Sequence, residues 1–194
     1  GRGTGAASQS LNVPGTKLVA MADAFGDNIG RAHETLKKQF GERVDVPEER
    51  RFHGFDAFKK AIDCADLVLL CTPPGFRPPH FEYAVAQGKH VFMEKPVAVD
   101  GPGIRKVIEA AKAADKKNLK VVCGLQRHYQ NSYLETLGKI KEGMIGDISS
   151  TQVYWSGGGV WTRDRKEGMT EMEYQMRNWY YFNWICGDHI TEQH

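Results

Sequence analysis

Short apolar runs, each ending at an acid or a turn residue, recur along the amino-terminal part of the chain. Runs of this length with turn signals at their ends are typical of buried β-strands. They predict strands at residues 17–22, 51–52, 66–71, 90–93 and 120–124. The run at 66–71 is the clearest of them, because it is almost wholly apolar and leads into Thr-Pro-Pro-Gly.

Between these runs, apolar residues recur at the three- and four-residue spacing of one helical face. One such face is formed by Ile29, Ala32, Leu36 and Phe40. Further patterns predict helices at 55–62, at 78–87 and from Pro102 to about 111. Gly88 stands where a helix over 78–87 would stop, since glycine is favoured just after a helix.

The alternation of apolar strands with helices predicts the fold class. Such strands, buried on both faces, are typical of a parallel sheet covered by helices, which is a doubly wound α/β fold. After Gly124 the pattern changes to a helix that ends near Gly143, followed by a predicted strand at 149–155 in a stretch rich in glycine and aromatic residues. We therefore expect one domain over residues 1–124 and the beginning of a second over 125–194.

Composition narrows the function classes. The net charge of +2 gives no electrostatic argument for binding nucleic acid or an anionic membrane. There is no apolar run of about 18 residues that could span a membrane. The four cysteines show no CxxC pairing, so we expect a reducing compartment and a cytoplasmic protein.

The amino end reads Gly-Arg-Gly-Thr-Gly, similar to the later half of a glycine-rich phosphate loop. It could also be a flexible leader. Asp23 ends its predicted strand 20 positions after Gly3, close to the spacing of about 20 residues at which an acid binds the ribose of NAD. This spacing favours a dinucleotide loop whose first strand would precede Gly1. The alternative for Asp23 is a helix N-cap.

Glu94, Lys95 and Pro96 follow directly on the predicted strand at 90–93. Proline lacks an N–H group and has a fixed φ, so it stops the strand and fixes the turn. Parallel α/β sheets bind their ligands at this carboxyl edge. Lys95 is therefore a candidate reacting group, and the alternative is a structural ion pair with Glu94 or another neighbouring acid.

With these motifs in place, the chain resembles the Gfo/Idh/MocA oxidoreductases. The resemblance rests on the glycine-rich start, Asp23 and Glu94-Lys95-Pro96, with Ala-Gln-Gly-Lys-His-Val leading into the last of these. It implies a Rossmann domain followed by a larger α/β domain, whose mostly antiparallel sheet carries the substrate and mediates oligomerisation. The chain would then hold only the start of that second domain and be truncated at both ends.

The resemblance also implies roles for individual residues. Gly1 and Gly3 match the phosphate loop and Asp23 the ribose-binding acid. Thr72 and Pro73 lie along the cofactor, Glu94 and Lys95 lie beside the nicotinamide, and Arg127 faces the substrate. The family's acid/base pair aligns with Glu192 and a histidine for which His194 is the nearest candidate, ahead of Asp188 and His189.

These residue types support a definite chemistry. Lys95 would polarise and protonate the substrate oxygen, because a cation near a developing alkoxide stabilises it. An acid at position 23 repels a 2′-phosphate, so NAD is preferred over NADP. Trp161 and Trp179 could stack on a sugar ring or belong to a core, and the sequence leaves this open. Asp188, His189, Glu192 and His194 could ligate a metal, but we favour acid/base residues without one.

The leading interpretation is an NAD-dependent oxidoreductase that acts on a sugar, polyol or related hydroxyl compound. The resemblance leaves two alternatives open: a glycosidase that uses bound NAD, and a regulator that senses nucleotide. The expected partners are a small carbohydrate-like substrate and further copies of the same chain, with neither nucleic acid nor a membrane.

Overall fold

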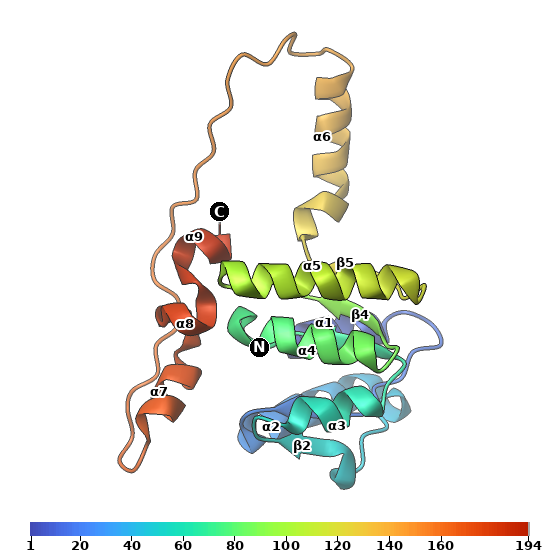
Figure 1. Ribbon diagram of the computed structural model, residues 1–194, viewed down its shortest axis with the longest axis vertical. Helices are drawn as coiled ribbons and strands as arrows, with labels where there is room; N and C mark the ends of the chain where they lie inside the picture. Colours follow the sequence, from blue (N-terminus) through green and yellow to red (C-terminus); the bar gives the residue numbers. More distant parts are fainter. Residues whose placement is uncertain (194) are drawn as a thin grey trace.

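The computed structural model describes residues 1–193 (Figure 1). All of its strand pairs are parallel. The strands are β1 (Met21–Asp23), β2 (Arg51–His53), β3 (Leu67–Leu70), β4 (His90–Met93) and β5 (Val121–Cys123). Each lies at a predicted run, and the first run is shortened to β1 with one further bridge between Leu18 and Val44. The expectation of a parallel α/β fold is confirmed.

The strands form two sheets instead of one. β1 pairs with β2, and the other sheet has the order β3-β4-β5. Between β1 and β3 lies a cavity of about 1780 Å³, lined along its length by residues of both strands. A doubly wound sheet has its first strand at this central position. Within the described residues, the edges of β1 and β3 that face the cavity carry no strand partner.

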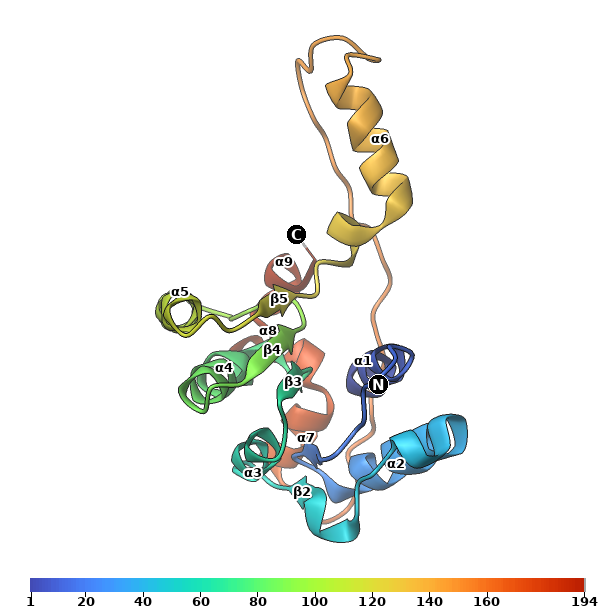
Figure 2. The same ribbon diagram turned by 90° about the vertical axis from the view of Figure 1, so that its right-hand side faces the viewer.

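Helices cover both faces of the strands (Figure 2). One face is covered by α1 (Arg2–Leu11) and α2 (Gly26–Phe40), and the other by α3 (Ala57–Asp63), α4 (Arg77–Ala86) and α5 (Gly101–Lys116). Two apolar clusters result, one around Phe81 and Val91 and the other around Leu11 and Leu36. Burial of these faces drives the packing, at about 25 cal/mol per Å² of apolar surface.

Local signals in the sequence explain where the helices begin and end. Asp100 caps α5, accepting a hydrogen bond from the Gly103 backbone nitrogen at 2.7 Å. Gly88 has a φ of +70° just after α4, which confirms the predicted stop.

The short 3₁₀ helices are η1 (Gly41–Arg43), η2 (Glu48–Arg50), η3 (Pro74–Phe76), η4 (Gln126–Tyr129) and η5 (Trp179–Tyr181).

Beyond β5 the chain leaves the sheet and then returns to it (Figure 1). It runs outward through α6 (Asn131–Lys141) and comes back as an extended segment. That segment leads to α7 (Glu171–Arg177), α8 (Asn183–Cys186) and α9 (Asp188–Gln193). α8 packs against η3, where a Cβ added to Gly75 would lie 2.8 Å from the Trp184 carbonyl oxygen. Only glycine allows the two backbones to approach so closely.

The predicted strand at 149–155 is wrong, and the expected antiparallel sheet does not form among the described residues. Residues 149–155 are irregular, and Val153 and Tyr154 are 79% and 76% exposed. A strand is stable only beside partners that take up its backbone hydrogen bonds and cover one face. Residues 125–193 contain no strand that could pair with this run. The domain boundary near residue 124 stays a prediction.

No helix in the described part of the chain is long and apolar enough to cross a membrane.

Candidate functional site

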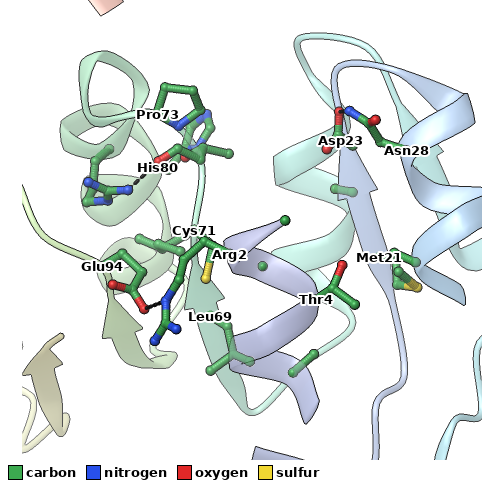
Figure 3. Close-up of a pocket in the computed structure, with 18 of the residues that line it drawn as sticks. Arg2, Thr4, Met21, Asp23, Asn28, Leu69, Cys71, Pro73, His80 and Glu94 are labelled. Carbon is green, nitrogen blue, oxygen red and sulfur yellow. Dashed lines mark hydrogen bonds and ion pairs between the residues drawn. The ribbon is translucent and has the colours of Figure 1, made fainter. Parts of the chain in front are cut away.

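The predicted cofactor residues gather at one edge of the sheets (Figure 3). Asp23 ends β1, Thr72 and Pro73 follow β3, and Glu94 follows β4. All four line the cavity between β1 and β3, together with the start of α1. Parallel strands have their carboxyl ends on the same side, so residues far apart in sequence meet there.

The glycine-rich start is helical and is not an extended loop. Gly1 is the N-cap of α1, and Gly3 lies in its first turn, where an added Cβ would lie 3.5 Å from the Cys71 Cβ. The first intrahelical hydrogen bond is donated by the Gly5 nitrogen to the Gly1 oxygen. The preceding N–H groups therefore have no partner within the helix and lie at the cavity, where they suit an anion.

Asp23 is oriented by its own turn. Its Oδ1 accepts hydrogen bonds from the Phe25 backbone nitrogen at 2.9 Å and from Asn28 Nδ2 at 3.0 Å. The N-cap of α2 is Phe25, so the alternative reading of Asp23 as a helix N-cap is wrong. The two bonds fix the carboxylate in place and use one of its oxygens. The other oxygen can accept bonds from a ligand on the cavity side.

Two buried side chains of α4 hold the turn after β3. Arg77 donates to the Thr72 carbonyl oxygen, and His80 Nδ1 lies 3.3 Å from Thr72 Oγ1. Burial, with the Arg77 charge as a second cause, lowers the pKa of His80 to about 4, so this imidazole is neutral at pH 7. Neither residue was predicted. A signal was available, because an arginine and a histidine lie three positions apart at the start of an apolar helix.

Glu94 connects the turn after β4 to α1. Its carboxylate is buried, and Arg2 Nε donates to Oε1 at 2.5 Å. On the other side, an added Cβ at Gly124 would lie 3.0 Å from Glu94 Oε2. The ion pair therefore joins the glycine-rich segment to the Glu-Lys-Pro turn, as Figure 3 shows. Lys95 forms its ion pair with a different acid, Glu192.

Lys95 instead contacts the far end of the chain. Its Nζ lies 3.1 Å from Glu192 Oε2 and also donates to the Glu192 backbone oxygen. The Glu192 side chain is 6% exposed, whereas that of Lys95 is 38% exposed. Glu192 Oε1 is buried without a hydrogen-bond partner in the described structure. The Lys95 amine is therefore accessible to a ligand, and Glu192 Oε1 remains able to accept a hydrogen bond.

The predicted substrate residues also border the cavity. Arg127 lies in η4 and stacks over the Trp155 ring at 5.2 Å, while the rings of Trp161 and Trp179 lie 5.7 Å apart. Asn178 fixes the extended segment to the end of α7. It accepts from the Arg163 nitrogen at 2.7 Å and donates to the Arg163 oxygen at 3.1 Å. Asn178 was not predicted.

The proposed acid/base histidine, His194, lies outside the described residues. Within residues 1–193, no three His, Cys, Asp or Glu side chains come together as metal ligands. Asp188 and His189 begin α9, one turn before Glu192.

The unsatisfied groups at this edge fit a dinucleotide. The free N–H groups at the start of α1 suit its phosphates, and the oriented Asp23 suits a ribose diol. Lys95 lines the same cavity. These residues are contributed by separate elements and converge on one space.

The sequence matches a family model described as the oxidoreductase family with an NAD-binding Rossmann fold, over residues 13–124. The chain belongs to this family, the Gfo/Idh/MocA oxidoreductases. The resemblance drawn from the motifs is therefore confirmed. The expectation of NAD as cofactor is confirmed at the level of the family, whose shared domain binds NAD.

Individual relatives carry two kinds of name. Inositol 2-dehydrogenase of Pseudomonas savastanoi pv. phaseolicola is 32% identical over 154 residues, covering 75% of this chain and 41% of that protein. Glycosyl hydrolase family 109 protein 1 of Bacteroides fragilis is 27% identical over 154 residues, covering 78% of this chain and 32% of that protein. The matched part of this chain thus covers 32% to 41% of the length of these relatives.

A solved structure gives the same relationship. Scyllo-inositol dehydrogenase from Lactobacillus casei, with bound cofactor NAD(H) and scyllo-inositol, has a TM-score of 0.60 and 27% sequence identity. The similarity covers 77% of this chain and 41% of that one.

Proposed function

We propose that the protein is an NAD-dependent oxidoreductase that transfers a hydride between the nicotinamide and a polyol or related hydroxyl compound. The observation that carries the proposal is the Lys95–Glu192 pair, in which Nζ and Oε2 lie 3.1 Å apart beside the cavity that Asp23 also lines. A cation can stabilise a developing alkoxide and a carboxylate can take up a proton, and both assist the oxidation of a hydroxyl group.

The proposed cofactor arrangement follows the lining of the cavity. Asp23 would accept hydrogen bonds from the adenosine ribose, and the start of α1 with Gly1 and Gly3 would receive the phosphates. Thr72 and Pro73 would lie along the cofactor, which brings its nicotinamide toward Glu94 and Lys95. A carboxylate at position 23 repels a 2′-phosphate, so we expect NAD to be preferred over NADP. When bound, this cofactor supplies the hydride acceptor.

Lys95 would hold the reacting hydroxyl oxygen. Its amine donates to Glu192 but is partly exposed, so it can donate to a substrate oxygen as well. Positive charge there stabilises the alkoxide that develops as hydride leaves, and Glu192 orients the amine. General acid–base transfer of this kind contributes about 10²–10⁴-fold to the rate. We propose that the hydroxyl proton passes to Lys95 as Lys95 releases one of its own protons to Glu192, with His194 as a further acceptor.

The substrate class is proposed from the relatives and from the aromatic side chains. Inositol is the substrate in the name of the Pseudomonas relative. Trp161 and Trp179 line the cavity, and a tryptophan ring can stack on the apolar face of a cyclic polyol. Arg127 would bind its hydroxyl groups. A cytoplasmic location and a homo-oligomeric state stay predictions.

A second candidate is a glycosidase that uses bound NAD. The relative from Bacteroides fragilis named as a glycosyl hydrolase supports it, because its match covers as much of this chain as the dehydrogenase match does. Both functions would use Lys95 in the same way, but only the dehydrogenase releases NADH. The nucleotide sensor stays the third alternative, and it would need no reacting lysine.

One set of measurements separates these functions. NAD binding is measured by isothermal titration, NADH formation by absorbance with a panel of inositols and sugars, and glycosidase activity with aryl glycosides. The proposal expects NAD binding and net NADH with at least one polyol. Aryl-glycoside cleavage without net NADH would favour the second candidate. NAD binding without either turnover would favour a sensor, and no NAD binding would refute all three.

A further inference from the structure

Arg77 is a charged side chain in a place where charges are rare. It is the first residue of α4 and is only 2% exposed. Fully buried arginines are uncommon and require hydrogen-bond partners, because an unpaired buried charge is costly. Its partners therefore indicate what the side chain does.

The guanidinium bonds to two backbone oxygens from two different turns. One terminal nitrogen donates to the Thr72 carbonyl oxygen after β3, and the other donates to the Pro96 carbonyl oxygen after β4. Its Nε is buried without a hydrogen-bond partner in the part of the chain that the structure describes. Thr72 belongs to the proposed cofactor turn, and Pro96 directly follows the proposed reacting lysine.

The charge of Arg77 is balanced at a distance. The carboxylates of Glu94 and Glu192 are both buried nearby, but they form their ion pairs with Arg2 and Lys95. Burial lowers the pKa of Arg77, and the negative charges of Glu192 and Glu94 act against that shift. No carboxylate of the described residues forms an ion pair with the guanidinium. Its hydrogen bonds go to the two carbonyl groups.

We propose that Arg77 is a positioning residue that sets the distance between the turn carrying Thr72 and Pro73 and the turn carrying Lys95. A planar guanidinium can donate to two carbonyl groups at once in a fixed geometry. The two turns would thereby move as one unit, and the spacing between the cofactor and the reacting amine would be fixed before either ligand binds. We call the two hydrogen bonds from Arg77 to the Thr72 and Pro96 carbonyl groups the clamp. The effect of the clamp on catalysis rests on the proposed function, whereas the clamp itself does not.

Arg77→Lys keeps the positive charge but loses the planar guanidinium with its two terminal nitrogens. It can reach one of the two carbonyl groups, which leaves the other buried and unsatisfied. Losing a hydrogen bond from a charged donor weakens local protection by about tenfold or more. Arg77→Met removes both bonds and the charge, so comparison of the two variants separates the geometry from the charge.

Arg43 offers a matched control. It also donates to two backbone oxygens, those of Val13 and Thr16, and is partly buried. Its contacts lie before β1, whereas those of Arg77 lie after β3 and β4. Arg43→Lys therefore imposes the same chemical change on an arginine whose backbone partners, Val13 and Thr16, are none of the proposed cofactor or substrate residues.

Hydrogen exchange tests the clamp without any ligand. In Arg77→Lys, exchange in residues 72–76 and 94–98 should rise together by about tenfold or more, whereas Arg43→Lys should affect only residues 13–17 and their surroundings. Unchanged exchange in Arg77→Lys, or a change in only one of the two turns, would overturn the proposal. If Arg77→Lys does not fold, native-state exchange of the wild type replaces it: the two turns should open with the same free energy, and different values would overturn the clamp.

Kinetics then test the consequence. Arg77→Lys and Arg77→Met should both lower kcat for polyol oxidation by at least about tenfold, while Arg43→Lys stays within about twofold of the wild type. If exchange in the two turns rises together but the protein does not bind NAD, the clamp is supported and the proposed function is refuted. Normal kcat in Arg77→Lys with disturbed exchange would refute the positioning role while the proposed function stands.

Discussion

Lys95 and Glu192 are 97 residues apart in the sequence, yet the lysine Nζ lies 3.1 Å from the glutamate Oε2. The contact joins the turn after β4 to the last described helix. α8 and α9 bring Glu192 back to the sheet after the long excursion through α6 (Figure 1). The acid that pairs with the proposed reacting lysine therefore comes from a segment outside residues 13–124, the part that matches the NAD-binding family.

Substitution of Lys95 should separate binding from turnover. In Lys95→Met, polyol oxidation should fall by about 10²–10⁴-fold, because the substrate hydroxyl loses the group that relays its proton and the positive charge that stabilises the alkoxide. Affinity for NAD, measured by isothermal titration, should change by less than about threefold, which is under 1 kcal/mol.

A surface lysine is the matched control for this variant. Lys106 pairs with Glu82 at 2.8 Å, and both side chains are largely exposed. Lys106→Met should leave both turnover and NAD affinity unchanged, since exposed pairs contribute little. Equal turnover in Lys95→Met and the wild type would remove Lys95 from the mechanism.

Asp23 should control cofactor choice. Asp23→Asn keeps the side-chain shape but removes the negative charge and one acceptor, so affinity for NAD should fall by about tenfold or more. The preference for NAD over NADP should narrow as well, because repulsion of the 2′-phosphate is lost. Asp27→Asn is the control: this acid pairs with Arg177 and Arg31, and its loss should leave both affinities as they were. An unchanged NAD/NADP ratio in Asp23→Asn would count against the ribose assignment.

His80 should make the protein sensitive to mild acid. Its pKa is about 4 in the folded protein and 6.5 ordinarily, so between these values the unfolded chain binds more protons at this residue. The neutral His80 therefore contributes fully to the free energy of unfolding above pH 6.5. This contribution is lost as the pH falls toward 4, and the loss reaches about 3 kcal/mol. Urea unfolding at pH 7.5, 5.5 and 4.5 measures this loss. In His80→Leu the fall should be smaller by that amount, and an identical pH dependence in both proteins would contradict the account.

Gly75 should be required for the docking of α8. An added methyl group would lie 2.8 Å from the Trp184 oxygen and 3.1 Å from the Ile185 oxygen. Gly75→Ala should therefore cost about 1–3 kcal/mol and displace α8, which Trp184 fluorescence and thermal unfolding would report. Gly30→Ala, in open space within α2, should instead stabilise the protein by up to about 1 kcal/mol. A Gly75→Ala variant as stable as the wild type would show that α8 does not pack there.

Most of the strands could be predicted because their local sequences carry the signals of buried strands. The runs before Asp23, Thr72 and Glu94 combine apolar residues with a turn signal, and each forms a parallel strand in the structure. The run at 149–155 ends in Val, Tyr and Trp, which favour strands, but it has no neighbouring strand among the described residues. Strand formation depends on a partner, which a single segment does not reveal.

The candidate site was only partly predictable for a related reason. Asp23 and Lys95 stand at strand ends, so their position in the sequence places them at the ligand-binding edge. Arg77 and His80 act through burial beneath a turn from a different element, and Asn178 acts on a distant extended segment. Such contacts arise from tertiary packing and leave only a weak signal, a polar residue within an apolar helical pattern.

The most direct test of the proposed function follows the hydride itself. The protein is incubated with NAD and a polyol, such as scyllo-inositol, that carries deuterium at its oxidised carbon, and the NADH formed is analysed by mass spectrometry. The account predicts NADH one mass unit heavier from the wild type, and at least about a hundredfold less of it from Lys95→Met. Unlabelled NADH, or equal labelling by the two proteins, would contradict it.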